Sequence, residues 1–192
     1  MDKPCVVVLL QNAWSTLYTW LECGLQPPDD HDWVWDRKGW LGAFERSRSG
    51  RRWSLTVDED ERWGSGVDAT ICNIPTWFDN TTPMIANRSS GVHRPDFDYM
   101  RRLLGGELLL KNKPGVVVAC GKQAAVAVLK VWDGSLVTMP HPACRVLTND
   151  AMIVARSVIR DAVQNFADNP NRVVRRQIVQ QRGRVEYHPL EA

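Results

Sequence analysis

The sequence predicts an α/β protein, a three-layer α/β/α sandwich built on a central four-stranded parallel sheet. Four short apolar runs lack polar alternation, which is typical of strands buried on both faces. Amphipathic segments separate these runs, and alternation of strands with helices favours a parallel sheet. The length of 192 residues and the hydrophobic fraction of 44% fit one soluble domain with a sizeable core.

Each predicted strand is bounded by residues that stop strands or open turns. The strands are expected at residues 5–11 (CVVVLLQ), 69–74 (ATICNI, closed by Pro75), 115–120 (GVVVAC) and 135–139 (SLVTM, closed by Pro140).

Four helices are expected around them, at residues 15–23, 96–104, 122–132 and 150–167. Asp96 is a suitable N-cap for the second helix, and Gly105 and Gly106 end it. Residues 1–168 therefore form the predicted domain, and residues 169–192 read as a basic C-terminal tail that becomes ordered with a partner. An irregular insertion, residues 26–66, lies between the first two strands, and such insertions are usually functional.

The formal net charge is only +2, but arginines cluster in two places. They are Arg46, Arg48, Arg51 and Arg52 in the insertion, and Arg172, Arg175, Arg176, Arg182 and Arg184 in the tail. Such clusters can bind phosphates, and the alternative is an ordinary solvated surface.

Several functional classes lack their sequence signatures. No apolar run reaches the roughly 20 residues that span a bilayer, and no signal peptide is recognisable, so we expect a cytoplasmic protein without membrane contact. Five cysteines without a CxxC pair argue against a zinc or iron–sulfur site, and no other cofactor is expected. His31 among acidic residues is a weaker metal candidate than a solvated loop. Neither a GxSxG elbow nor a phosphate-binding GxxxxGK[ST] loop occurs.

Polar residues follow the predicted strands, at the edge where open parallel sheets bind ligands. They are Gln11 and Asn12 after the first strand, Asn73 on the second, Lys122 after the third and His141 after the fourth. Their shared location favours a functional site. The structural alternative is that His141 caps a turn and that the asparagines satisfy loop backbone groups.

The segments VVVLLQNAWS, ICNIP, VVVACGKQA and MPHPACR occur in this order along the chain. Together they resemble the motifs of the uracil-DNA glycosylase superfamily over roughly residues 5–165. The resemblance implies that fold and a monomeric DNA N-glycosylase, a hydrolase that needs no metal or cofactor.

The resemblance also implies roles for individual residues. Asn12 would position the attacking water or contact the sugar-side oxygen, and His141 would donate a hydrogen bond to the carbonyl of the departing base. Asn73 would read the edge of the flipped base, Phe44 or Trp14 would stack on it, and Gln11 would line the pocket. In the loop of residues 143–148, Leu147 would act as a wedge and Arg145 would contact the DNA backbone, as would Arg48, Arg51 and Lys122.

The chain departs from the family pattern at the first motif. Position 12 is Asn rather than Asp, and Ala13 and Trp14 replace the usual Pro and a small residue. A 5-substituted pyrimidine, as in hypermodified phage DNA, is therefore the expected substrate, and such a substrate suggests a role in phage defence. The opposite outcome is that Trp14 fills the pocket and makes it smaller. A non-catalytic DNA- or nucleotide-binding module and an unrelated nucleoside hydrolase remain alternatives.

Overall fold

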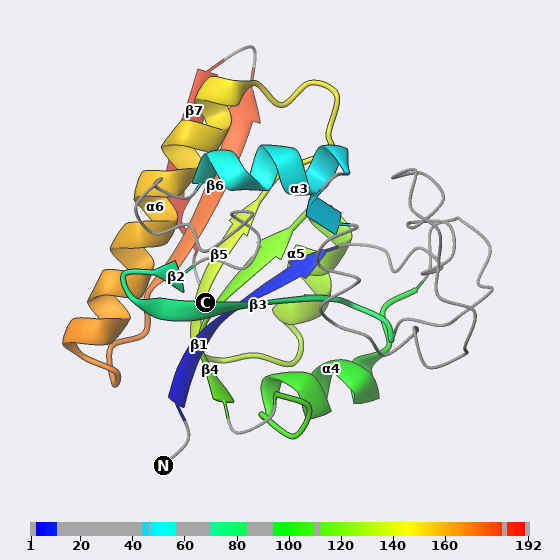
Figure 1. Cartoon of the computed structure of the whole chain (residues 1–192), viewed down its shortest axis with the longest axis vertical. Helices are drawn as coiled ribbons and strands as arrows, with labels where there is room; N and C mark the ends of the chain where they lie inside the picture. The colour runs from blue at the N-terminus through cyan, green and yellow to red at the C-terminus, as the bar shows by residue number, and fades with distance from the viewer. Residues whose placement is uncertain are drawn as a thin grey trace.

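The centre of the molecule is a seven-stranded sheet with the order β2-β3-β1-β4-β5-β6-β7 (Figure 1). The computed structural model describes residues 3–10, 44–45, 47–56, 70–83, 94–109, 112–181 and 184–190. The strands are β1 Lys3–Leu10, β2 Thr70–Ile71, β3 Ile74–Asn80, β4 Asn112–Cys120, β5 Ser135–Met139, β6 Arg175–Gln181 and β7 Arg184–Pro189. Neighbours from β3 to β6 are parallel, and β2 and β7 pair antiparallel at the two edges. The α/β class is as predicted, but the sheet is mixed and has seven strands where four were expected.

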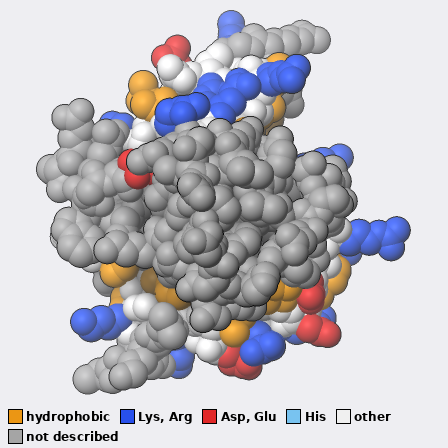
Figure 2. Space-filling model, turned by 45° about the vertical axis from the view of Figure 1, so that its right-hand side comes forward, with side chains coloured by type: hydrophobic (Ala, Val, Ile, Leu, Met, Phe, Trp, Pro, Cys, Tyr) orange, Lys and Arg blue, Asp and Glu red, His pale blue; other side chains and the backbone are white. Residues whose placement is uncertain are grey.

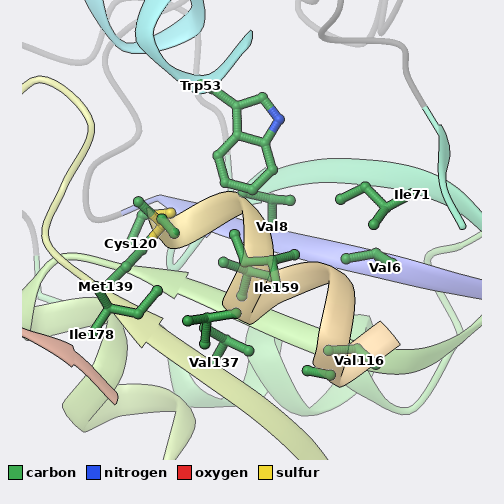
Figure 3. Packing of buried hydrophobic residues seen from close by; sticks show 14 of the residues in the cluster. Val6, Val8, Trp53, Ile71, Val116, Cys120, Val137, Met139, Ile159 and Ile178 are labelled. Atoms are coloured by element: carbon green, nitrogen blue, oxygen red, sulfur yellow. The ribbon is translucent and has the colours of Figure 1, made fainter. Parts of the chain in front are cut away.

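Helices cover both faces of the sheet. Along β1, Val6, Val8 and Leu10 belong to one apolar cluster, while Val7 and Leu9 belong to another, because successive side chains of a strand point to opposite faces. The first cluster includes residues of α3 (Arg48–Trp53) and α6 (Asn149–Asp168). The second includes residues of α4 (Phe97–Leu104) and α5 (Lys122–Val128). The described elements therefore form three layers. Figure 3 shows the first cluster, with Trp53 of α3 over the sheet.

Helices α4 and α6 begin and end close to where the sequence predicts, whereas α3 lies in the insertion that was expected to be irregular. Asp96 caps α4, its side chain accepting a hydrogen bond from the Tyr99 N–H at 2.9 Å. Thr148 caps α6 in the same way, through the Ala151 N–H at 3.2 Å. Helix α5 stops at Val128, four residues before the predicted end. The predicted helix at 15–23 lies outside the described residues. No helix among those described is long and apolar enough to cross a membrane.

The predicted strand at 69–74 is wrong, because the chain reverses inside it. Cys72 and Asn73 have φ of 51° and 61°, and they form the turn of a hairpin between β2 and β3. Two consecutive residues with positive φ suit the twist of a tight hairpin, and Asn accepts this conformation readily. The parallel strand is β3, where Ile74, Thr76, Phe78 and Asn80 are buried and the residues between them are more exposed.

The prediction that residues 169–192 form a tail separate from the domain, ordered only with a partner, is wrong for the part that the structure describes. Strand β6 pairs with β5, and β7 returns antiparallel beside it. Val174 and Ile178 are buried in the same cluster as α6, with 6% and 3% of their surfaces exposed. Because these two apolar residues lie among arginines and glutamines, the polar composition of the segment does not indicate a strand. The strand nevertheless covers the open edge of β5.

Candidate functional site

Four parallel strands end side by side at one edge of the sheet. In the pairing register Leu10 of β1 lies opposite both Asn80 and Cys120, and Cys120 lies opposite Met139. Two backbone hydrogen bonds tie the segments beyond these ends, from Thr81 N–H to the Leu10 carbonyl at 3.2 Å and from Gly121 N–H to the Met139 carbonyl at 2.8 Å. Gln11, Asn12 and Trp14, which were predicted at this edge, lie outside the described residues.

Asn80 ends β3 at this edge and is 2% exposed. Its backbone N–H donates to Asp79 Oδ1 at 2.8 Å. A carboxamide carries both N–H donors and a carbonyl acceptor, so this side chain has the groups that recognise a polar planar ligand. The sequence signal for Asn80 was available in the alternation Ile74, Thr76, Phe78, Asn80, but two of these residues are polar and the pattern was missed.

Asn73, which was predicted for this role, is at the other end of the same strand. It is exposed in the β2–β3 turn and precedes β3, so it lies at the amino edge of the parallel strands. The structure therefore does not bring Asn73 together with His141.

His141 follows β5 at the carboxyl edge, as predicted. Its Nδ1 accepts a hydrogen bond from the Ala143 N–H at 3.1 Å. An amide can only donate, so Nδ1 carries no proton and the neutral ring holds its proton on Nε2. Burial lowers the pKa of His141 from 6.5 to about 4 because it disfavours the charged form. At neutral pH the side chain is therefore an uncharged donor through Nε2–H.

Asn80 and His141 are separated by three strand intervals, from β3 across β1 and β4 to β5. At about 4.8 Å per interval the separation is about 14 Å, too far for a direct bond and wide enough for a ligand between them. Between them Gly121 follows β4 with φ of 99°, a conformation that favours glycine, and it adds no side chain to this edge.

Cys120 is the one described thiol at the end of a central strand, and it is fully buried. Burial raises the pKa of the Cys120 thiol far above its usual range, so it stays protonated and is a poor nucleophile. Cys120 therefore provides no reactive thiolate at this edge.

The loop after His141 presents a different apolar residue from the one predicted. Leu147 is 4% exposed and belongs to the core cluster, whereas Val146 is 76% exposed. Leu147 therefore cannot serve as an exposed wedge in this conformation. Arg145 beside Val146 is exposed, as its predicted contact with DNA requires.

The other predicted contacts divide into exposed and buried residues. Phe44 is 5% exposed and packs on Phe78, with ring centroids 5.4 Å apart, so it belongs to the core rather than to an open stacking surface. Arg48 and Arg51 on α3 are exposed, as is Lys122 at the start of α5. Figure 2 shows Lys and Arg side chains gathered at the upper end of the molecule, the end where Figure 1 places the turn between β6 and β7.

Metal ligation finds no support among the described residues, where no three His, Cys, Asp or Glu side chains lie close enough to hold an ion. His31 and its acidic neighbours lie outside those residues. The chain matches no family model, no curated protein and no solved structure.

Proposed function

We propose that this chain is a DNA N-glycosylase that flips out a uracil-like or 5-substituted pyrimidine and hydrolyses its N-glycosidic bond. The observation that carries the proposal is the pair of groups at one sheet edge, a neutral Nε2–H donor on His141 and a buried carboxamide on Asn80. The order of motifs along the sequence supports the same family of reactions.

The chemistry needs such groups. When the bond between the sugar C1′ and the base nitrogen breaks, its electron pair leaves with the base and the sugar becomes oxocarbenium-like. A donor aimed at a base carbonyl stabilises the developing anion, and an uncharged imidazole does this without first losing a proton. His141 is assigned this role. Water then adds its hydroxyl to C1′, and its remaining proton neutralises the anion of the released base. Asn12 keeps its predicted role of positioning that water.

Asn80 is assigned the recognition of the base, in place of Asn73. A base must leave the helix stack to reach the edge of the sheet, and hydrogen bonds to its polar edge then offset the cost of unpairing. The carboxamide of Asn80 supplies both donor and acceptor at the end of β3.

Val146 is assigned the role of the wedge, in place of Leu147. It is exposed, apolar and five residues after His141, so it can enter the gap left by the flipped base while His141 contacts that base. Arg145, Arg48, Arg51 and Lys122 are assigned to phosphates, which gives binding that weakens with salt.

Incubation with three matched oligonucleotides tests the function. They carry uracil, a 5-hydroxymethyl or glucosylated pyrimidine, or only unmodified bases, and alkaline heating then converts any abasic site to a strand break. Breaks in a modified substrate support the glycosylase. A gel shift without breaks in any substrate would replace it with a DNA-binding module, and release of base only from free nucleosides would replace it with a nucleoside hydrolase. A higher kcat/KM for the bulkier pyrimidine than for uracil is expected from the altered first motif.

A further inference from the structure

The backbone of residues 141–148, here called the His141 loop, is held on one side by a single guanidinium. Nη1 of Arg52 donates to the carbonyl of Pro142 at 3.2 Å and to that of Cys144 at 3.0 Å. Its Nη2 donates to the carbonyl of Leu147. Because the guanidinium is a rigid planar fork, three bonds from it fix three points of the loop relative to one another.

On another side the loop is held by Gln180 of β6. The Gln180 Nε2 donates to the Val146 carbonyl at 2.9 Å, and its Oε1 accepts from the Thr148 N–H at 3.3 Å. These two bonds lie on either side of Leu147. The first holds the carbonyl of Val146, the exposed apolar residue of the loop, and the second holds Thr148, the N-cap of α6.

Both holding residues are themselves attached to the core. Trp53, next to Arg52, is completely buried and meets the Phe78 ring edge-on at a centroid distance of 5.4 Å. The short helix η2 (Ser54–Thr56) follows, and Arg156 of α6 donates to its Leu55 carbonyl through Nε at 3.1 Å and Nη2 at 2.6 Å. Gln180 lies on β6, the strand that also carries the buried residue Ile178.

We infer that Arg52 and Gln180 are positioning residues that hold the His141 loop in one shape before any substrate binds. Arg52 holds the carbonyls of Pro142 and Cys144, the residues before and after Ala143, whose N–H bonds His141 Nδ1. Gln180 holds the carbonyl of Val146 and so fixes the direction of that residue. Arg52 is then distinct from Arg48, since its guanidinium is engaged with the loop rather than with a phosphate. The roles of His141 and Val146 in this inference rest on the proposed function, whereas the hold on the loop does not.

The hold is tested first without any activity measurement. NMR of the ring nitrogens and carbons gives the tautomer and the pKa of His141, with assignment by His141→Gln. In the wild type we expect the Nε2–H tautomer and a depressed pKa. In Arg52→Met and Gln180→Met the loop opens to water, so we expect faster amide exchange at Ala143 and a His141 pKa that moves toward the ordinary 6.5. Gln177→Met, an exposed glutamine on the same strand, is the matched control and should change neither.

The second arm measures single-turnover base release at saturating enzyme. A misplacement of about 1 Å costs up to about 10²-fold in rate, so Arg52→Met should lose rate on this order with little change in affinity. Arg52→Lys, which keeps the charge but loses the fork, should recover only part of it. Arg48→Met should instead weaken binding and reduce its salt dependence, because it removes a phosphate contact.

The two arms separate the two ideas. If the wild type releases no base, the proposed function fails, and the NMR arm still decides whether the loop is held. If base is released but Arg52→Met and Gln180→Met keep the wild-type rate and His141 titration, the inference is overturned. Thermal unfolding of each variant identifies any that fail to fold, and Gln180→Met, at a partly exposed position of the sheet, then decides alone.

Discussion

Asn80 and Asn73 lie at opposite ends of β3, and that makes them a matched pair for testing where the base is read. We expect Asn80→Ala to lower kcat/KM by about 10²–10³-fold, the usual loss when one stabilising donor is removed from a site. Asn73→Gly should keep wild-type activity, because glycine retains the positive φ of 61° at that turn. Base release from the preferred oligonucleotide is the measurement. Equal effects of the two substitutions would place the reading of the base elsewhere.

Gly50 in α3 is required by a close approach of two backbone segments. A Cβ added there would lie 2.7 Å from the Cα of Glu45 and equally close to the carbonyl carbon of Phe44. Gly50→Ala must therefore move α3, and we expect the free energy of unfolding to fall by about 1–3 kcal/mol. Urea denaturation is the measurement, with Ser49→Ala on the same helix as the control. If both variants unfold like the wild type, the packing of α3 on residues 44–45 is looser than described.

Strand β6 is the element whose nature composition concealed, and substitutions can show that it belongs to the core. Ile178→Ala should lower the free energy of unfolding by about 2–5 kcal/mol, since it empties a buried site, whereas Val173→Ala should stay within about 0.5 kcal/mol. Ile178 is 3% exposed and Val173 is 55% exposed. A disordered tail would give two neutral substitutions in the same denaturation measurement, and that result would remove β6 from the sheet.

The elements that the sequence predicts well are those with a local signal. Strand β5 and helix α4 are bounded by Pro140, by the Asp96 cap and by Gly105, all readable from neighbouring residues. His141 was placed correctly for the same reason, because a proline stops the strand just before it. The β2–β3 hairpin, Asn80 and strand β6 depend on partners far along the chain, and polar residues in their buried positions weaken the apolar pattern. Whether Leu147 or Val146 is the exposed apolar residue depends on how one turn packs, and the spacing of apolar residues in the sequence does not determine this.

For the molecule as a whole, the neutral His141 makes stability depend on pH. Its pKa is about 4 in the folded protein and 6.5 in the unfolded chain, so the unfolded chain binds more protons between these values. Above pH 6.5 both states hold His141 neutral, and the free energy of unfolding is not reduced. As the pH falls from 6.5 to 4, proton uptake by the unfolded chain lowers the free energy of unfolding by about 3 kcal/mol.

Urea unfolding at pH 4 and pH 7.5 measures this contribution. Wild type and His141→Gln are compared, so that the carboxylates common to both cancel. The stability advantage of the wild type should shrink by about 3 kcal/mol on going to pH 4. A difference that is independent of pH would mean that His141 is as accessible to protons in the folded protein as in the unfolded chain.

The hydrogen bonds of Arg52 to the His141 loop join residues 90 to 95 positions apart, and those of Gln180 reach the loop from 32 to 34 positions beyond it. Contacts of such sequence separation form late, because the entropy of closing long chain segments must be overcome first. During synthesis, which runs from the amino terminus, the loop is made well before β6 leaves the ribosome. A nascent chain can therefore assemble β1, β3, β4 and β5 and still lack the last support of the loop, so the loop reaches its final shape only after the hairpin of β6 and β7 has docked.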